Sequence, residues 1–294
     1  MTAKFQLPRN LQSFCEVRHP ADAVVPILIR PVRDAVHEWM TEINMRTALE
    51  SVNIEPRNTA LLYGPPGCGK TTLAHHFAAR LGMSLISVKM DSIVSSYVGK
   101  TENHIGELFS TIKNAEVPAV LFLDEFDAIA TSRTSDGSSA GKGKDAVVNA
   151  LLVRIEEHKG ICIAATNRGD AIDPALWRRF GLHLDIGLPG QEERFAILNK
   201  YLFPYALPEK DIDTLAEEMA GASPALIKQV MEGIKRSLIL NPCLNRPIDA
   251  NTILGQVLAS VKPHAAYATP PLWESLTDIL PAISWPPQPC PKAA

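Results

Sequence analysis

The chain has 294 residues, of which 46% are hydrophobic and 21% charged, with a formal net charge of −3. This balance argues against a dedicated protein that coats nucleic acid with a basic surface, although it leaves room for a local basic patch, so we do not expect a nucleic-acid partner. No apolar run approaches the roughly 18 residues that cross a bilayer, and no signal peptide opens the sequence. The five cysteines lack metal-site or disulfide spacing. We therefore expect a soluble, cytoplasmic protein with no membrane partner.

The first half of the chain predicts an α/β domain. Residues 1–24 are polar and read as an N-terminal arm, and the apolar spacing from Val32 to Ile43 predicts a helix. Apolar runs that alternate with helical patterns then predict a parallel sheet covered on both faces. The expected strands are 59–64, 84–88, 119–124, 160–166 and 183–188, and the expected helices are 71–81, one within 95–113, and 144–157.

The second half predicts helices only. After Pro189 the strand patterns stop, and helices are expected near 191–203, 211–219, 223–240 and 249–261. Residues 263–294 contain eight of the 23 prolines and are expected to be irregular. Their apolar side chains, Trp273, Leu276, Ile279 and Trp285, could dock on the body. The expected division is an arm (1–24), a nucleotide-binding α/β domain (25–190), a helical lid (191–262) and a proline-rich tail (263–294).

The stretch GPPGCGKT matches G-x-x-x-x-G-K-[ST] directly after a predicted strand and before a predicted helix. Backbone N–H groups of such a loop surround phosphate oxygens, and the positive end of the helix assists them. Lys70 is expected to neutralise the β- and γ-phosphates of ATP, and the Thr71 hydroxyl to coordinate Mg²⁺. The predicted nucleotide-binding residues are Gly64, Pro65, Pro66, Gly67, Cys68, Gly69, Lys70, Thr71, Thr72 and Asp124.

Two further strands end in polar residues. AVLFLDEFD delivers Asp124 and Glu125 to the carboxyl edge of the sheet, where parallel sheets bind ligands. Asp124 is expected to hold Mg²⁺ and Glu125 to act as general base on the attacking water. The structural alternative is that these two residues are simply acids at the start of a helix, where the helix dipole favours negative charge. Asn167, in AATNR, is expected to sense the γ-phosphate, although asparagine after a strand is commonly a turn residue.

GPPGCGKT, SSYVGKTE, VLFLDEFDAIA, IAATNR, IDPALWRRF and DIGLPG occur in this order. Together they resemble the AAA family of AAA+ ATPases over roughly residues 30–240. The resemblance implies a P-loop NTPase fold, with an α/β large domain and a small helical lid. It also implies a hexameric ring that binds ATP at subunit interfaces and remodels or unfolds other proteins.

The resemblance also implies an arginine finger, a cation that one subunit inserts into its neighbour's site. Alignment on the Arg-Phe pair makes Arg179 the first finger, while the place of a second falls on Leu182. Either Arg178 supplies the second cation or hydrolysis relies on one finger.

The family's pore loop carries an aromatic–hydrophobic–glycine triplet that grips a polypeptide, matched here by Tyr97, Val98 and Gly99. Core packing of Tyr97 is the alternative. Lys142 and Lys144 are expected in a flexible loop that either lines the channel or is simply solvated.

The favoured function is a Mg²⁺-dependent ATPase that forms a homo-oligomeric ring and threads a protein client past Tyr97. A nucleotide-gated switch or scaffold without threading is the alternative from another class, and a DNA-associated ATPase is a third. The residues do not identify the client or an adaptor. Compact members of the family serve HORMA-protein-remodelling or peptidase-linked defence systems, and nothing in the sequence selects between these.

Overall fold

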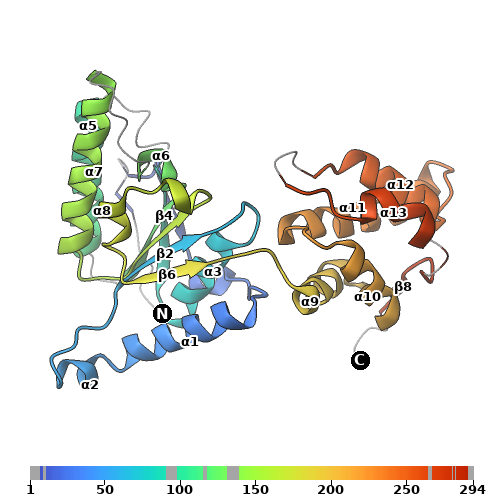
Figure 1. Ribbon diagram of the computed structural model, residues 1–294, viewed down its shortest axis with the longest axis horizontal. Helices are drawn as coiled ribbons and strands as arrows, with labels where there is room; N and C mark the ends of the chain where they lie inside the picture. The colour runs from blue at the N-terminus through green and yellow to red at the C-terminus, as the bar shows by residue number, and fades with distance from the viewer. Residues whose placement is uncertain are drawn as a thin grey trace. The chain divides into compact units, whose positions relative to one another are not determined.

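A computed structural model describes residues 7–8, 11–90, 98–114, 118–130, 139–263, 267–279, 281 and 283–290. For residues 98–102, 130, 139–146 and 279 only the backbone is described. The described residues fall into two compact units (Figure 1). Unit 1 comprises the described residues up to 186, except for residues 27–29 and 66–68. These two segments belong to unit 2, together with the described residues from 187 onward.

Unit 1 is built on a six-stranded sheet in the order β1-β3-β4-β5-β2-β6. Neighbouring strands from β3 to β6 are parallel, and β1 runs antiparallel to β3 at one edge. The carboxyl ends of the parallel strands therefore meet at one edge of the sheet, which is where such sheets bind ligands. The predicted α/β fold is confirmed. The strands are β1 (Cys15–Arg18), β2 (Thr59–Tyr63), β3 (Ser84–Lys89), β4 (Ala119–Asp124), β5 (Cys162–Thr166) and β6 (Leu182–Asp185).

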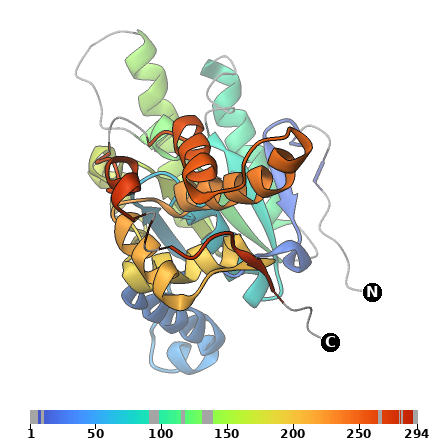
Figure 2. The same cartoon turned by 90° about the vertical axis from the view of Figure 1, so that its right-hand side faces the viewer.

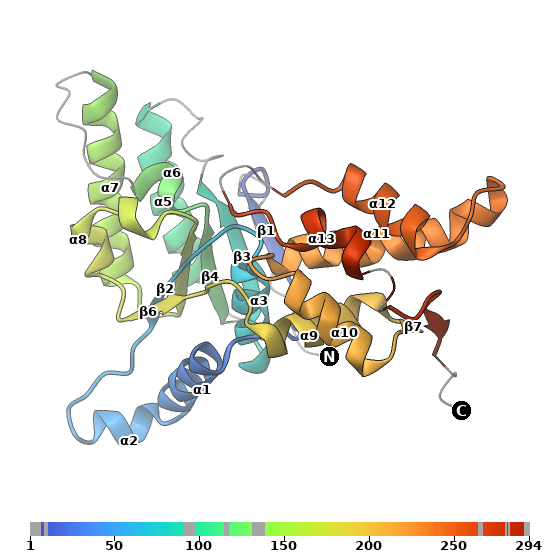
Figure 3. The same ribbon diagram turned by 45° about the vertical axis from the view of Figure 1, so that its right-hand side comes forward.

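Helices cover both faces of this sheet. α5 and α7 lie side by side on one face, and α1 and α3 lie on the other (Figures 1 and 3). Successive residues of a strand point to opposite faces, so Leu121 and Leu123 of β4 join the core under α5 and α7. The helical elements are η1 (Pro20–Asp22), α1 (Arg30–Asn44), α2 (Arg46–Glu50), α3 (Lys70–Arg80), α5 (Val98–Lys113), α6 (Asp127–Ala130), α7 (Ser139–Glu157), η2 (Gly169–Ala171) and α8 (Pro174–Trp177).

Part of the segment expected to be an N-terminal arm belongs to the sheet. β1 pairs along its length with Leu85–Val88 of β3. Leu11 is fully buried and Phe14 nearly so, and the His75 ring of α3 lies 2.9 Å from the His19 carbonyl oxygen. Burial raises the pKa of the Cys15 thiol to about 12, which suits a packing role. CEVR alternates apolar and polar residues over only four positions, the shortest length at which such a pattern indicates a strand.

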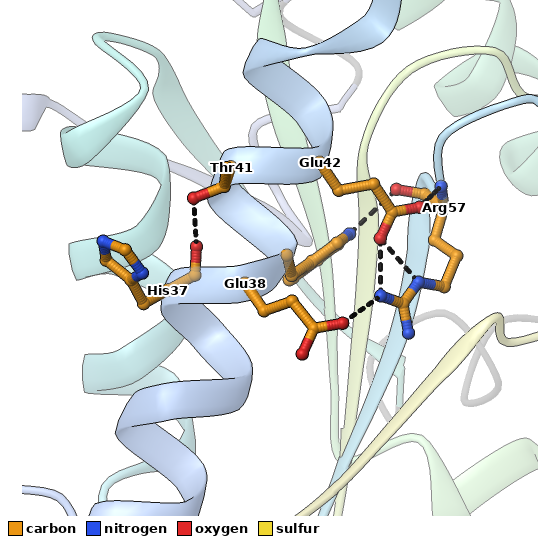
Figure 4. Close-up of polar contacts among 6 residues, drawn as sticks. His37, Glu38, Thr41, Glu42 and Arg57 are labelled. Atoms are coloured by element: carbon orange, nitrogen blue, oxygen red, sulfur yellow. Dashed lines mark hydrogen bonds and ion pairs between the residues drawn. The ribbon is translucent and has the colours of Figure 1, made fainter. Parts of the chain in front are cut away.

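α1 holds the chain just before β2 (Figure 4). The Glu42 carboxylate accepts hydrogen bonds from the Arg57 backbone N–H at 2.6 Å and from its Nε at 2.7 Å, and Glu38 lies 3.3 Å from its Nη2. Burial works to raise the pKa of Glu42, but the hydrogen bonds from Arg57 lower it overall. Trp39 Nε1 donates to the Arg57 carbonyl oxygen at 2.8 Å, and its ring stacks on Phe77 of α3. α1 thus fixes the start of the strand that leads to the glycine-rich loop.

The start of α7 corrects the expected loop around Lys142 and Lys144. α7 begins at Ser139, so both residues lie in a helix, although Gly141 and Gly143 suggested a loop. Each glycine costs a helix about 1 kcal/mol relative to alanine. Packing of α7 along α5 continues through buried residues such as Val147 and outweighs this local cost.

Unit 2 is helical and includes the C-terminal segment (Figure 2, orange to red). The four predicted helices correspond to α9–α12. The segment expected to be irregular contains α13, whose Leu272 is fully buried. Trp273 Nε1 donates to the carbonyl oxygens of Leu258 and Val261 at 3.3 and 3.0 Å, so this segment is docked on α12 and the turn after it. The elements are α9 (Gln191–Leu202), β7 (Tyr205–Ala206), α10 (Glu209–Glu218), α11 (Pro224–Cys243), α12 (Ala250–Ser260), α13 (Leu272–Ile279) and β8 (Gln288–Pro289).

Among the helices that the structure describes, none is both long and apolar enough to span a bilayer.

His158, between α7 and β5, is a buried histidine. Its ring packs edge-on against Phe109, with centroids 5.5 Å apart. Within the described residues, its Nε2 has no hydrogen-bond partner. Burial lowers the pKa of His158, and a weaker backbone interaction with Ile161 opposes the shift. The folded protein therefore favours the neutral ring.

We expect the free energy of unfolding to fall as the pH drops below about 6.5, the ordinary histidine value. Between the folded and unfolded pKa values the unfolded chain binds more protons, so acid favours unfolding there, and the stability is fully present above this window. Denaturant titrations at pH 7.5 and 5.5 should show a smaller loss for His158→Gln than for the parent. The exposed His37→Gln serves as control and should lose as much as the parent. An equal loss in His158→Gln would contradict the assignment.

Candidate active site

The glycine-rich loop joins β2 to α3 and depends on two glycines. Gly64 has φ +137°, and a Cβ there would lie 2.3 Å from the Ile186 carbonyl oxygen. Gly69 caps α3 at φ +92°, in the left-handed region that favours glycine. The loop therefore runs backbone against backbone at the carboxyl edge of the sheet. Of its remaining residues, Pro66 and Gly67 are exposed and Cys68 is buried.

Lys70 opens α3, and its ammonium group is held by the loop itself. Its side chain is buried, and Nζ donates to the carbonyl oxygens of Gly64 and Pro65 at 2.7 and 2.9 Å. A buried ammonium group needs such partners. These bonds hold a positive charge beside the loop and the N-terminus of α3, where an anion is favoured. Thr72, two residues further on, is half-buried.

Thr71 and Asp124 meet across the site. Thr71 Oγ1 donates to Asp124 Oδ2 at 3.0 Å, so the first turn of α3 lies against the end of β4. A hydroxyl and a carboxylate are the hard oxygen ligands that Mg²⁺ prefers. Within the described residues there is no cluster of three acidic, histidine or cysteine side chains that could hold a metal. The pair suits a cation that phosphate oxygens and water also ligate.

Glu125, the residue after Asp124, has an unusual backbone conformation. It has φ +53°, a left-handed conformation that costs a non-glycine residue about 1–3 kcal/mol. Its N–H donates to Asp124 Oδ1 at 3.0 Å, and the next N–H, that of Phe126, donates to the Ala165 carbonyl oxygen at 2.8 Å. Phe126 is fully buried against Phe180. These contacts hold the turn, while the Glu125 residue itself stays exposed beside the predicted Mg²⁺ ligands.

Asp127 is a site residue that sequence reasoning missed. Its Oδ1 accepts hydrogen bonds from Thr166 Oγ1 at 2.8 Å and from the Asn167 backbone N–H at 3.4 Å. It therefore ties the start of α6 to the end of β5 and positions Asn167. The signal was the third acid of DEFD, two residues after Glu125. Asn167 is exposed and follows β5, directly beside the strand that ends at Asp124.

The two predicted finger residues make different contacts. Arg178 turns back on α8, where its Nε donates to the Pro174 carbonyl oxygen at 3.2 Å. Arg179 reaches α7 and pairs with the Glu156 carboxylate. Both partners are about half exposed, and such surface pairs contribute only about 0–1 kcal/mol. Arg179 can therefore exchange Glu156 for another anion at little cost.

An aromatic stack, also missed from the sequence, fixes α8. The Trp177 ring lies nearly parallel to the His183 ring of β6, with ring centroids 4.3 Å apart. It also lies beside the Tyr63 ring of β2, with ring centroids 5.3 Å apart. The His183 ring also lies 2.9 Å from the Trp177 carbonyl oxygen. The stack places the arginines that follow Trp177 at a defined point beside the sheet.

The predicted pore-loop triplet is not among these contacts. Tyr97 lies outside the described residues, and Val98 and Gly99 are the first residues of α5, with backbone alone described. Their role stays a prediction. The described site therefore consists of the loop, Lys70, Thr71, the Asp124–Asp127 turn and the end of β5.

Comparison with known proteins matches this site to a family. The model described as "ATPase family associated with various cellular activities (AAA)" matches residues 60–188. Proteasome-activating nucleotidase of Methanopyrus kandleri is 34% identical over 209 residues, 69% of this chain and 47% of the relative. Uncharacterized AAA family ATPase y4kL of Sinorhizobium fredii is 46% identical over 129 residues, 43% of this chain and 38% of the relative. Peroxisomal ATPase PEX1 of Arthrobotrys oligospora is 40% identical over 176 residues, 56% of this chain and 14% of the relative. The chain thus spans less than half the length of these relatives.

Proposed function

Because the chain belongs to the AAA family of ATPases, we propose that it hydrolyses ATP with Mg²⁺ and uses the energy to remodel a protein client. The observation that carries this proposal is the hydrogen bond between Thr71 and Asp124 beside the buried Lys70. It brings two oxygen ligands and a cation together at the carboxyl edge of the sheet, as hydrolysis of a nucleoside triphosphate requires.

Each residue has a defined task in this proposal. Bound Mg²⁺ offsets the negative charge of the ATP phosphates, and Thr71 and Asp124 would hold it. Lys70 neutralises the β- and γ-phosphates. Glu125 orients a water molecule and accepts its proton as the water attacks the γ-phosphorus. Asn167, held by Asp127, donates from its amide to the γ-phosphate or to the water.

We propose further that the protein works as a homo-oligomeric ring, hexameric as in the resembled family. Arg179 would leave Glu156 and enter the site of the neighbouring subunit, where a cation stabilises the charge of the transferring phosphoryl group. Arg178 is a weaker candidate for a second finger, because its side chain is turned back on α8. The name of one relative, a proteasome-activating nucleotidase, supports a role in handling proteins.

The client is proposed only as a class. A polypeptide would pass Tyr97 and Val98, whose side chains grip varied sequences, while Gly99 allows the loop to turn. The client would be recognised either directly or through a separate adaptor, and HORMA-type or peptidase-linked proteins are the client classes that the resemblance suggests. We propose the cytoplasm as the place of action. The alternative, a nucleotide-gated scaffold, needs no pore loop.

Tyr97→Ala should hydrolyse ATP at the parent rate and fail to remodel a client. The client is first captured on a variant that binds ATP without turnover, then labelled to report its unfolding. The parent should unfold it only with Mg²⁺ and ATP, and Tyr97→Phe should retain the activity. Full remodelling by Tyr97→Ala, or remodelling with a non-hydrolysable ATP analogue, would favour the scaffold. Absence of Mg²⁺-dependent hydrolysis in the parent would refute the enzyme itself.

A further inference from the structure

Thr59, the first residue of β2, holds the backbone on both sides of Phe180. Its Oγ1 donates to the Arg179 carbonyl oxygen at 3.1 Å and accepts from the Gly181 N–H at 3.0 Å. A hydroxyl has one proton to donate and lone pairs that accept, so both hydrogen bonds form at the same time. Thr59 is itself buried, so water does not readily replace these bonds. We call this pair of hydrogen bonds the Thr59 clasp.

Phe180, the residue inside the clasp, is anchored by its ring. It is almost fully buried and packs edge-on against Phe126, with ring centroids 5.6 Å apart. The Phe126 N–H in turn donates to the Ala165 carbonyl oxygen at 2.8 Å, at the end of the neighbouring strand β5. Residues 179–181 are therefore held at a carbonyl group, a ring and an N–H group, which fixes their backbone.

The Arg179 side chain is held differently from its backbone. Its guanidinium group pairs with the Glu156 carboxylate, and both side chains are about half exposed, where such pairs are weak. The cation can leave Glu156 while the point from which it extends stays in place. This combination suits a residue that inserts its charge into another site, because a misplacement of about 1 Å at a catalytic group can cost about a hundredfold in rate.

The Thr59 clasp lies at the amino edge of the sheet. β2 runs from Thr59 to Tyr63 toward the glycine-rich loop, and at about 3.3 Å per residue its two ends are on the order of 13 Å apart. Asn58, just before the clasp, donates from Nδ2 to the His158 carbonyl oxygen at 2.8 Å, so the end of α7 with Glu156 lies at the same edge. Thr59 is therefore remote from the nucleotide site of its own chain.

We propose that Thr59 is a positioning residue for ATP hydrolysis. Its hydroxyl would hold residues 179–181 so that Arg179 reaches the γ-phosphate bound by the neighbouring subunit. The inference rests on the proposed ring and finger, and it adds the residue that orients the finger. The alternative is that the clasp only stabilises the fold, because β6 begins at Leu182, directly after it. A positioning role predicts a loss of turnover in the neighbour's site, whereas a structural role predicts a loss of folded protein.

Replacement of the hydroxyl tests this role. Thr59→Val keeps the size and the β-branching that suit a strand and removes both hydrogen bonds of the clasp. It should lower kcat for ATP about ten- to a hundredfold. The affinity for a fluorescent ATP analogue should stay at the parent value, because the glycine-rich loop of the same chain is unchanged. A parent kcat in Thr59→Val would overturn the proposal, as would a loss of ATP binding, which would show that the hydroxyl serves the fold.

Two further variants serve as controls. Thr59→Ser restores a hydroxyl at the same position and should recover most of the turnover. Thr41→Val makes the same chemical change in α1, where the hydroxyl donates to the His37 carbonyl oxygen at 2.9 Å within the helix, and it should hydrolyse ATP at the parent rate. A loss in Thr59→Ser or in Thr41→Val as large as that in Thr59→Val would overturn the proposal.

Mixed oligomers locate the defect. Thr59→Val keeps Glu125, and Glu125→Gln keeps both Thr59 and Arg179, so some interfaces of the mixture combine an intact base with a positioned finger. Turnover of this mixture should exceed the mean of the two separate rates. The mixture of Thr59→Val with Arg179→Ala has no positioned finger and should show no such gain. Equal gains in the two mixtures, or none with Glu125→Gln although light scattering shows mixed oligomers, would overturn the proposal.

A double variant separates the role of Thr59 from that of the finger. In the Arg179→Ala background Thr59→Val should lower turnover no further, because the residue that it positions is gone. A further loss as large as in the parent would overturn the proposal. If Arg179→Ala loses turnover and Thr59→Val does not, only the role of Thr59 fails. If the parent shows no Mg²⁺-dependent hydrolysis, the proposed enzyme fails and the role of Thr59 with it.

Discussion

Glu125→Gln should stop ATP turnover while the protein still binds ATP. The amide keeps the size of the side chain and removes the basic oxygen that accepts the proton of the attacking water. General-base catalysis contributes about a hundred- to ten-thousand-fold in rate. Phosphate release should fall by that order, while titration with a fluorescent ATP analogue should give an affinity close to that of the parent. Lys70 and the Thr71–Asp124 pair, which hold the nucleotide and Mg²⁺, are unchanged.

Glu125→Asp is the matched control, because it keeps the carboxylate and shortens its reach. It should retain measurable turnover. The backbone at this position is held by the buried Phe126 and its bond to Ala165, so neither substitution should unfold the turn. Turnover by Glu125→Gln at the parent rate would show that another group accepts the proton.

Arg179→Ala should lower ATP turnover by about a thousand-fold or more, with ATP binding retained. A finger cation from a neighbouring subunit supplies an effect of this size because it stabilises charge that is largest in the transition state. Glu156→Gln provides a control that releases Arg179 from its partner and keeps the cation. It should hydrolyse ATP at the parent rate or faster. Loss of activity in Glu156→Gln alone would instead indicate that the ion pair has a structural role.

Mixing tests whether Arg179 acts between subunits. Arg179→Ala keeps an intact Glu125, and Glu125→Gln keeps an intact Arg179. In mixed oligomers some interfaces combine an intact base with an intact finger, so the mixture of two inactive variants should regain turnover. No recovery, although light scattering shows mixed oligomers, would contradict action in trans. Arg178→Ala in the same assay measures the contribution of the second arginine.

Local sequence patterns predicted the parts of the site whose geometry depends on residues close together in the chain. The glycine-rich loop and the Asp124–Glu125 turn each follow a buried strand, so their geometry is encoded within a few residues. The contacts of Asp127 with Thr166 and of Arg57 with Glu42 join segments far apart in sequence. No local pattern specifies such pairs, because each depends on how helices and strands pack. Trp177 and His183 are only six residues apart, but their stacking also depends on how α8 packs beside β6, and it orients α8.

Two differences in the fold have the same cause. The glycines near Lys142 predicted a loop, but packing along α5 extends α7 over them. The prolines of the C-terminal segment predicted irregular chain, yet Leu272 and Trp273 dock and α13 forms. In α7 tertiary burial outweighs a local cost of about 1 kcal/mol per glycine. In the C-terminal segment the prolines lie before and after α13, so they do not interrupt the helix, and burial of its apolar side chains stabilises it.

The pairing of β1 with β3 sets an order of events during biosynthesis. Cys15 leaves the ribosome well before Val88, its partner in the sheet. At about 5–20 residues per second, synthesis of the intervening chain takes on the order of 4–15 s. For that time a strand destined for a sheet edge has no partner in its own chain, and unpaired strands are templates for association with other chains. The yield of folded protein should therefore depend on how fast the message is read between these two positions.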